Sequence, residues 1–204
     1  GIAKFPDNQK RMWAAYYASV TFMDEQVGRI LDELDRLGLR EKTAIVFTSD
    51  HGYHLGEHTF WQKSNLHEEV TRVPLVISLP GLKPGRSKSL VELVDLFPTL
   101  SRLAGLQAPK GLHGTSLLPI LRDPAARVKE SALSIHGSGT SMRTANWTYT
   151  RYKDGSEELY DMENDPGQFT NRARDTESAK TLAGQRKAFE KRLGAAGLKP
   201  ARVR

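Results

Sequence analysis

One polar loop holds the residues whose types and spacing could do chemistry. Asp50 and His51 stand side by side, separated by two residues from the apolar run 44–47, and His58 and Lys63 follow in the same loop. The apolar run is rich in β-branched and aromatic residues, which indicates a buried strand. The Asp50 carboxylate and the His51 imidazole can share one divalent cation, for which calcium, magnesium, manganese and zinc are all candidates.

Two ligands do not complete a metal site, because calcium takes about six to eight donors. The other donors must come from elsewhere. A structural alternative is that Asp50 caps a turn while Gly52 supplies a positive φ. His58 is expected to fix the loop by hydrogen bonds or to face solvent, and it is kept as a candidate substrate contact. Lys63 is a surface lysine by default, but its point charge would suit a sulfate or phosphate oxygen.

The elements that must position this loop lie on both sides of it. Apolar residues recur at steps of three and four before the loop, which predicts a helix over residues 8–37 that ends at Gly38. Strands are expected at residues 43–48 and 74–79, with a helical turn at residues 66–70 between them.

A second helix is expected to begin with Asp95 as its N-cap and to end at Gly105, with Leu96, Leu100 and Leu103 facing inward. Because helices and strands alternate in this part of the chain, we predict a parallel sheet covered by helices. Open α/β sheets bind ligands and metals just past the carboxyl ends of their strands, and the polar loop lies at such a place.

The pattern changes after about Pro124, where short segments alternate with glycine and polar turns. These segments predict an antiparallel sheet, followed by a helix over residues 176–193. We therefore expect a large α/β portion at residues 1–124 and a small α+β subdomain at residues 125–204. The four strands are expected at residues 132–135, 141–144, 147–152 and 158–160.

Composition narrows the class of protein. The 204 residues are 38% hydrophobic and 26% charged, as in an ordinary soluble globular protein, and no apolar run has the length of a membrane span. The chain has no cysteine, so disulfides, thiolate metal sites and a cysteine nucleophile are excluded within it. Residues 1–10 carry no signal-peptide pattern.

The net charge of +6 comes from the C-terminal end. Ten basic and three acidic residues lie between Arg172 and Arg204, a local net of +7, so the other 171 residues sum to about −1. A solvated helix face explains this basicity. Basic and aromatic residues are not interleaved as a nucleic-acid surface would require, so we expect no nucleic-acid partner.

An ordered set of segments across most of the chain resembles the sulfatase family of the alkaline-phosphatase-like superfamily. Among its branches, the Asp-His pair and the Leu-Gly-Glu-His run are most similar to iduronate-2-sulfatase-like enzymes. The segments are Tyr16–Val20, Met23–Asp24, Gln26–Arg29, Thr48–Gly52, Leu55–His58, Trp61, Lys63, Thr71–Leu75, Val94–Leu100, Ala104–Leu106, Arg143–Thr144, Trp147, Tyr149, Leu159–Asp161 and Asn164–Pro166.

The resemblance implies a fold and a site. The fold would be the C-terminal part of a mixed sheet sandwiched by helices, together with the small α+β subdomain. Asp50 and His51 match two ligands of the divalent cation, which is calcium in most sulfatases, with manganese or magnesium as alternatives. Lys63 matches the lysine that contacts the sulfate.

The family's nucleophile does not match any part of this chain. In sulfatases it is a formylglycine made from a Cys- or Ser-x-Pro-x-Arg motif, which lies near an Asp-Asp metal pair in the N-terminal half. Neither motif occurs here. We therefore expect the C-terminal portion of a sulfatase, inactive alone, whose partners are its own N-terminal portion and a sulfated small molecule or carbohydrate. The resemblance implies a periplasmic, secreted or lysosome-like location.

Three alternatives stay open. The first is a phosphonate monoester or phosphodiester hydrolase, which uses a similar Asp-His pair and lysine. The second is a non-catalytic remnant that binds anions or glycans through the small subdomain. The third is a truncated chain that completes its site with another chain.

Overall fold

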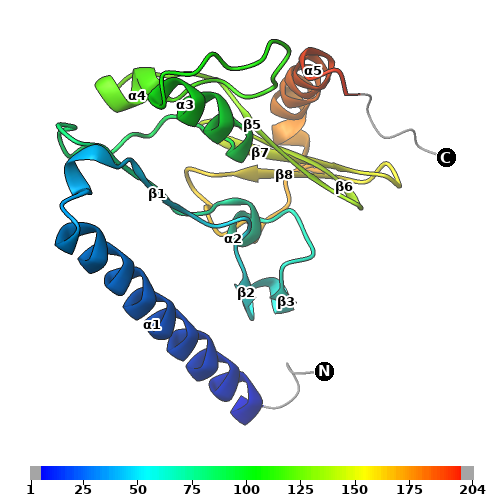
Figure 1. Cartoon of the computed structure of the whole chain (residues 1–204). Helices are drawn as coiled ribbons and strands as arrows, with labels where there is room; N and C mark the ends of the chain where they lie inside the picture. The colour runs from blue at the N-terminus through cyan, green and yellow to red at the C-terminus, as the bar shows by residue number, and fades with distance from the viewer. Residues whose placement is uncertain (1–5, 199–204) are drawn as a thin grey trace. The chain divides into compact units, whose positions relative to one another are not determined.

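The computed structural model describes residues 6–198 (Figure 1). The chain packs into two compact units. The first runs up to Lys63 and includes Arg72–Leu82, and the second combines Ser64–Thr71 with the chain from Lys83 onward. The predicted division into residues 1–124 and 125–204 concerned the parts of the family fold, and it stays a prediction.

The first unit begins with the long helix α1 at Pro6–Arg36, which confirms the helix predicted from the apolar period. Gly38 then takes a φ of +65°, the left-handed conformation that ends many helices and that glycine adopts without strain. Much of the apolar stripe of α1 is uncovered, with exposed fractions of 43% at Val20, 40% at Met23 and 68% at Ile30. Within residues 6–198, this stripe lacks the covering layer that such a face normally has.

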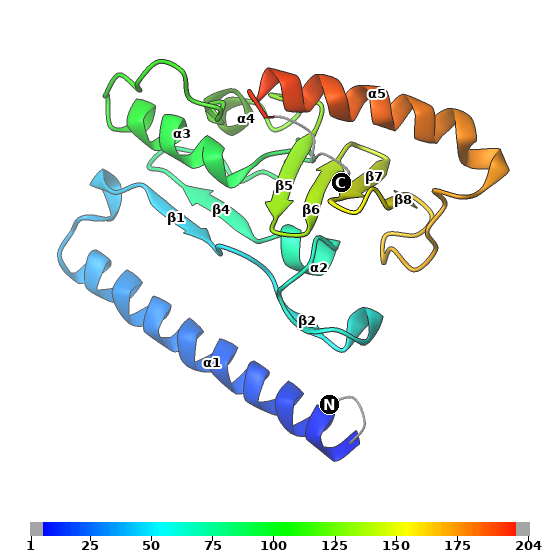
Figure 2. The same ribbon diagram turned by 90° about the vertical axis from the view of Figure 1, so that its right-hand side faces the viewer.

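Strands β1, at Ile45–Thr48, and β4, at Leu75–Ser78, form a two-stranded sheet (Figure 2). They pair antiparallel, with Ile45 opposite Ser78, so the predicted parallel pairing of these strands is wrong. A parallel pair needs a crossover, usually a full helix, and the intervening chain forms only a small hairpin, a 3-10 turn and a four-residue helix. The predicted burial of β1 is also wrong, because its four residues are half-buried.

A small hairpin completes the first unit between these strands. Its strands are β2, at His54–Leu55, and β3, at Trp61–Gln62, which pair antiparallel. The short 3-10 turns η2, at Arg40–Lys42, and η3, at Glu57–Thr59, precede β1 and connect the two hairpin strands.

The second unit contains the predicted antiparallel sheet and C-terminal helix. The strands follow one another in the order β5-β6-β7-β8, and the helix α5 lies along one face of the sheet (Figure 2). Apolar residues of β6, β7, β8 and α5 form the core at this contact, namely Met142, Tyr149, Leu159, Leu182, Phe189 and Leu193. The bounds are Ala132–His136 for β5, Gly139–Arg143 for β6, Trp147–Tyr152 for β7, Glu157–Asp161 for β8 and Ala179–Ala195 for α5, which the 3-10 turn η5 at Thr176–Ser178 precedes.

The start of helix α3 differs in detail from the prediction. Asp95 does precede α3, but its side chain makes no cap hydrogen bond to that helix. Instead Glu92 and Asp95 form a capping box around the 3-10 turn η4. The remaining bounds are Glu68–Thr71 for α2, Leu93–Asp95 for η4, Leu96–Leu103 for α3 and Leu118–Arg122 for α4.

The inward face of α3 is more polar than predicted. Leu100 is 41% exposed, so its predicted inward orientation is wrong. The buried positions are Asp95, Pro98 and Thr99. Thr99 accepts a hydrogen bond from the Leu117 backbone N–H at 2.8 Å, and this bond helps to turn the polar side of the helix inward.

Candidate functional site

The polar loop begins where β1 ends, and hydrogen bonds within it fix the Asp50-His51 pair. Ser49 Oγ donates to the His51 carbonyl at 2.8 Å, and the His51 backbone N–H donates to Asp50 Oδ1 at 3.0 Å. The Asp50 side chain is 82% exposed and the His51 side chain 31% exposed. The carboxylate therefore keeps its second oxygen, Oδ2, for another contact.

The protonation state of the His51 ring follows from its neighbours. Nδ1 lies 2.8 Å from the Gly52 carbonyl oxygen, which can only accept, so Nδ1 carries the proton. Nε2 of the neutral ring is then an acceptor, and Lys63 Nζ donates to it at 2.5 Å. A backbone carbonyl that fixes the tautomer in this way is the usual partner of a metal-binding histidine.

The donor pair fits a divalent cation. Asp50 Oδ2 and His51 Nε2 lie 3.5 Å apart. Two ligands at right angles on a cation, each about 2.3–2.6 Å from it, are themselves separated by roughly 3.3–3.7 Å. The Lys63 ammonium occupies the His51 Nε2 lone pair in this structure, so a cation bound by His51 would take its place. The two residues therefore provide one oxygen and one nitrogen at a spacing that suits a bound cation.

The pair does not make a complete metal site. No group of three or more carboxylate, histidine or cysteine ligands that could hold a metal ion occurs within residues 6–198.

The hairpin that follows has an unusual backbone. His58, Thr59 and Gln62 have φ values of +54°, +63° and +82°, a region that side chains other than glycine rarely occupy. Hydrogen bonds across the turn hold it, including Gly56 N–H to the Phe60 carbonyl at 3.0 Å. Such conformations persist where the surroundings enforce them, and they are frequent at functional sites.

His58 makes a ring contact with a neighbouring residue of the hairpin. His58 lies on the hairpin, with its ring edge-on to the ring of His54 at a centroid distance of 6.0 Å. His54 is fully buried, and its ring also lies 5.6 Å from that of Phe60. These contacts place His58 against the buried His54, while its hydrogen bonds to the loop and its contact with substrate stay predictions.

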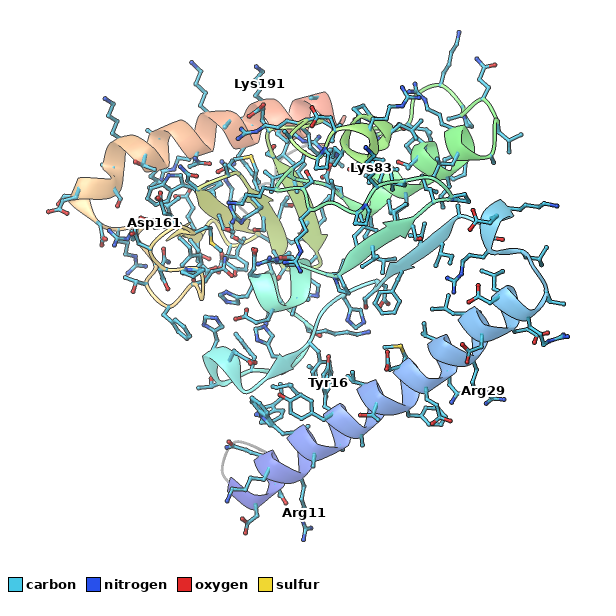
Figure 3. The ribbon with its side chains drawn as sticks, turned by 90° about the vertical axis from the view of Figure 1, so that its left-hand side faces the viewer. Arg11, Tyr16, Arg29, Lys83, Asp161 and Lys191 are labelled. Carbon is cyan, nitrogen blue, oxygen red and sulfur yellow. The ribbon has the colours of Figure 1, made fainter. Side chains whose placement is uncertain are left out.

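Helix α1 supports the loop through aromatic side chains to which the sequence analysis assigned no such contact. Trp13 Nε1 donates to the Leu55 carbonyl at 2.7 Å, and the rings of Tyr16 and Tyr53 lie 5.5 Å apart. Figure 3 shows Tyr16 on the side of α1 that faces the hairpin. Trp13 and Tyr16 are three positions apart and therefore share one helix face, and this spacing is the sequence feature that could have predicted the contact.

Two family models match the chain. The model described as Sulfatase matches residues 3–106, which include the whole polar loop. The model described as N-sulphoglucosamine sulphohydrolase, C-terminal, matches residues 56–193.

Curated relatives agree with these models. Choline-sulfatase of Rhizobium meliloti is 34% identical over 174 residues, an alignment that covers 82% of this chain and 34% of the relative. Human iduronate 2-sulfatase is 43% identical over 129 residues, covering 50% of this chain and 24% of the relative. The chain thus spans about a third or less of the length of these relatives.

Solved structures show the same fold over nearly the whole chain. The structure of BT4656 in complex with its substrate D-glucosamine-2-N,6-O-disulfate has a TM-score of 0.90 at 28% identity and covers 97% of this chain and 43% of that one. Phosphonate monoester hydrolase of Agrobacterium radiobacter has a TM-score of 0.83 at 26% identity, and the match covers 93% of this chain and 42% of that one. These matches confirm the expected fold class, part of an alkaline-phosphatase-like mixed sheet sandwiched by helices.

Proposed function

Since the chain belongs to the sulfatase family, we propose that the complete protein hydrolyses sulfate esters, with a sulfated carbohydrate as substrate. The observation that carries this proposal is the convergence of Asp50, His51 and Lys63 in one loop. The structurally similar BT4656 was solved with a disulfated glucosamine, which supports a carbohydrate substrate.

Each residue of the loop has a proposed role. Asp50 and His51 would hold a divalent cation, with calcium first and manganese or magnesium as alternatives. That cation would polarise the sulfate and neutralise its charge. Lys63 would stabilise the charge on the transferring sulfuryl group, and its ammonium would contact the sulfate directly. The Gly52 carbonyl accepts from Nδ1, so Nε2 is the His51 nitrogen that would bind the cation.

The nucleophile is proposed to lie outside these 204 residues. The chain has no cysteine and no Ser-x-Pro-x-Arg motif that could supply a formylglycine. It also covers about a third of the length of its curated relatives. The chain alone is therefore proposed to be inactive.

The uncovered face of α1 supports the proposal that a further portion of the same enzyme packs against this chain. Its apolar stripe is exposed, and the β1-β4 sheet has two strands within the described part of the chain. A two-stranded sheet is marginally stable alone, and a large exposed apolar helix face normally has a covering layer. We propose that the N-terminal portion of the same enzyme covers α1 and extends this sheet.

The location is proposed to be periplasmic, secreted or lysosome-like, by analogy with the family. None of the helices in the described residues combines the length and the apolar character needed to cross a bilayer.

A side-by-side assay of two substrates tests the function. The complete protein is incubated with 4-nitrophenyl sulfate and with 4-nitrophenyl phenylphosphonate, and kcat/KM is compared. We expect the sulfate ester to be the better substrate. A clear preference for the phosphonate would favour the alternative of a phosphonate monoester hydrolase, to which the match with the Agrobacterium radiobacter enzyme gives support. Turnover of neither, with metal-independent glycan binding, would favour a non-catalytic remnant.

A further inference from the structure

The second unit contains a hollow that the proposed chemistry does not use. Its volume is about 420 Å³, and two chain segments line it, residues 86–89 and 124–127. Most of its lining residues are exposed, so the hollow is open to solvent. None of the lining residues belongs to the polar loop at residues 49–63.

Three basic side chains line this hollow, which we call the basic cavity: Arg86, Lys88 and Arg127. None of the three forms an ion pair among the residues that the structure describes, and no acidic residue lines the cavity. Elsewhere in the same unit, basic residues such as Lys129 and Arg186 are paired with glutamates. Three uncompensated positive charges around one concavity raise the local potential and attract anions.

The backbone of the two lining segments is held in place. A Cβ added to Gly85 would lie 2.8 Å from Pro124 Cγ, so the chain approaches the proline more closely than a side chain would allow. Asp123 Oδ1 accepts a hydrogen bond from Ala125 N–H at 2.9 Å, which fixes the turn before Arg127. The nearby carboxylate of Asp123 is therefore engaged with the backbone of its own turn.

The side chains indicate what the cavity would bind. Arginine presents several N–H donors in a planar fork that matches the oxygens of an oxoanion, and lysine adds a point charge. We propose that the basic cavity binds a sulfate group, carried by a sulfated carbohydrate, at a position additional to the one that Lys63 contacts. The identity of the anion rests on the proposed function. Free inorganic sulfate has the same chemistry and is the other source of such a group.

Binding measurements on the complete protein test this site. The probes are a heparin hexasaccharide, an unsulfated N-acetylheparosan hexasaccharide of the same length, and sodium sulfate. The variant Arg86→Gln/Lys88→Gln/Arg127→Gln removes the three positive charges of the cavity. The control Lys180→Gln/Lys187→Gln/Lys191→Gln removes the same charge from exposed positions of α5, where Figure 3 shows Lys191 pointing outward.

We expect the cavity variant to bind the heparin hexasaccharide about tenfold more weakly and the control variant to stay within about twofold of wild type. The unsulfated hexasaccharide should bind neither the wild type nor the variants measurably. Equal losses in the two variants, or equal binding of the unsulfated sugar, would overturn the proposal. If only sodium sulfate binding is lost in the cavity variant, free sulfate is the ligand and the carbohydrate proposal is wrong.

Hydrolysis of 4-nitrophenyl sulfate separates this proposal from the proposed function. That substrate carries a single sulfate, so the cavity variant should hydrolyse it at the wild-type rate. Absence of hydrolysis in the wild type would refute the proposed function. The difference in binding between the two triple variants would still show whether the basic cavity binds the sulfated ligand.

Discussion

Lys129 lies between two buried carboxylates, and its removal should strongly destabilise the second unit. Its Nζ is 2.5 Å from Glu92 Oε2 and 2.7 Å from Asp95 Oδ1. The three side chains are at most 10% exposed, and that of Asp95 is fully buried. Arg192 also donates to Glu92 Oε2, at 2.9 Å. The substitution Lys129→Met keeps the bulk of the side chain but removes the shared positive charge.

The size of this destabilisation depends on the interactions that Glu92 and Asp95 keep after Lys129 is replaced. Removal of one partner from a buried ion pair costs about 3–5 kcal/mol, because the other charge stays buried. Arg192 stays on Glu92, and two backbone N–H groups still donate to Asp95. The loss should therefore lie near the low end, about 3 kcal/mol. For a chain of this size, that corresponds to a fall in Tm of roughly 6–12 °C.

Urea denaturation followed by far-UV circular dichroism measures the free energy of unfolding, and hydrogen exchange in β5 and α3 reports on the second unit directly. The matched control is Lys187→Met, at an exposed position of α5, which should change stability by less than about 0.5 kcal/mol. If Lys129→Met is no more destabilising than this control, the buried network does not contribute as argued.

Two further predictions concern the same unit. Phe189 is 1% exposed, and its ring lies edge-on to that of Tyr149 at a centroid distance of 5.1 Å. Phe189→Ala should therefore lower the free energy of unfolding, measured by urea denaturation, by about 3–5 kcal/mol. The control Leu106→Ala, at an exposed position, should lower it by less than about 0.5 kcal/mol, and equal effects would contradict the assigned core. Burial, with Glu158 nearby, raises the pKa of Tyr152 and Tyr160. The neutral phenols thus contribute stability that is complete below the unfolded-state pKa of about 10 and is lost as pH rises above it. The urea concentration at the midpoint of unfolding should therefore fall between pH 9 and pH 11, and a constant midpoint would contradict this.

Local patterns predicted the elements well, because they depend on neighbouring residues. The apolar period gave α1, and the short alternating segments gave β5 to β8 and α5. The pairing of β1 with β4 could not be obtained in this way, since its direction depends on how the intervening chain folds. Likewise, the position of Leu100 was decided by the hydrogen bonds of Asp95 and Thr99 with distant backbone groups.

The roles of the candidate site residues stay predictions, but the structure does show how these residues are arranged. The neighbouring residues Asp50 and His51 and the nearby Lys63 could be named from types and spacing, and the structure brings them into contact. The tautomer of His51 needed the position of the Gly52 carbonyl, which the sequence does not contain. The basic cavity was missed because Arg86 and Arg127 are far apart in the sequence and come together only in the folded unit.

The most direct test of the account is the rate of sulfate-ester hydrolysis by the complete protein with Lys63→Ala. We predict that kcat for 4-nitrophenyl sulfate falls by about 10²–10³-fold, as when one charge-stabilising group is lost, while the far-UV circular dichroism spectrum is unchanged. Lys83→Ala, at an exposed position outside the helices and strands, is the control and should keep the wild-type rate. A Lys63→Ala protein that keeps a rate within about threefold of wild type would contradict the assignment of this loop to sulfate-ester hydrolysis.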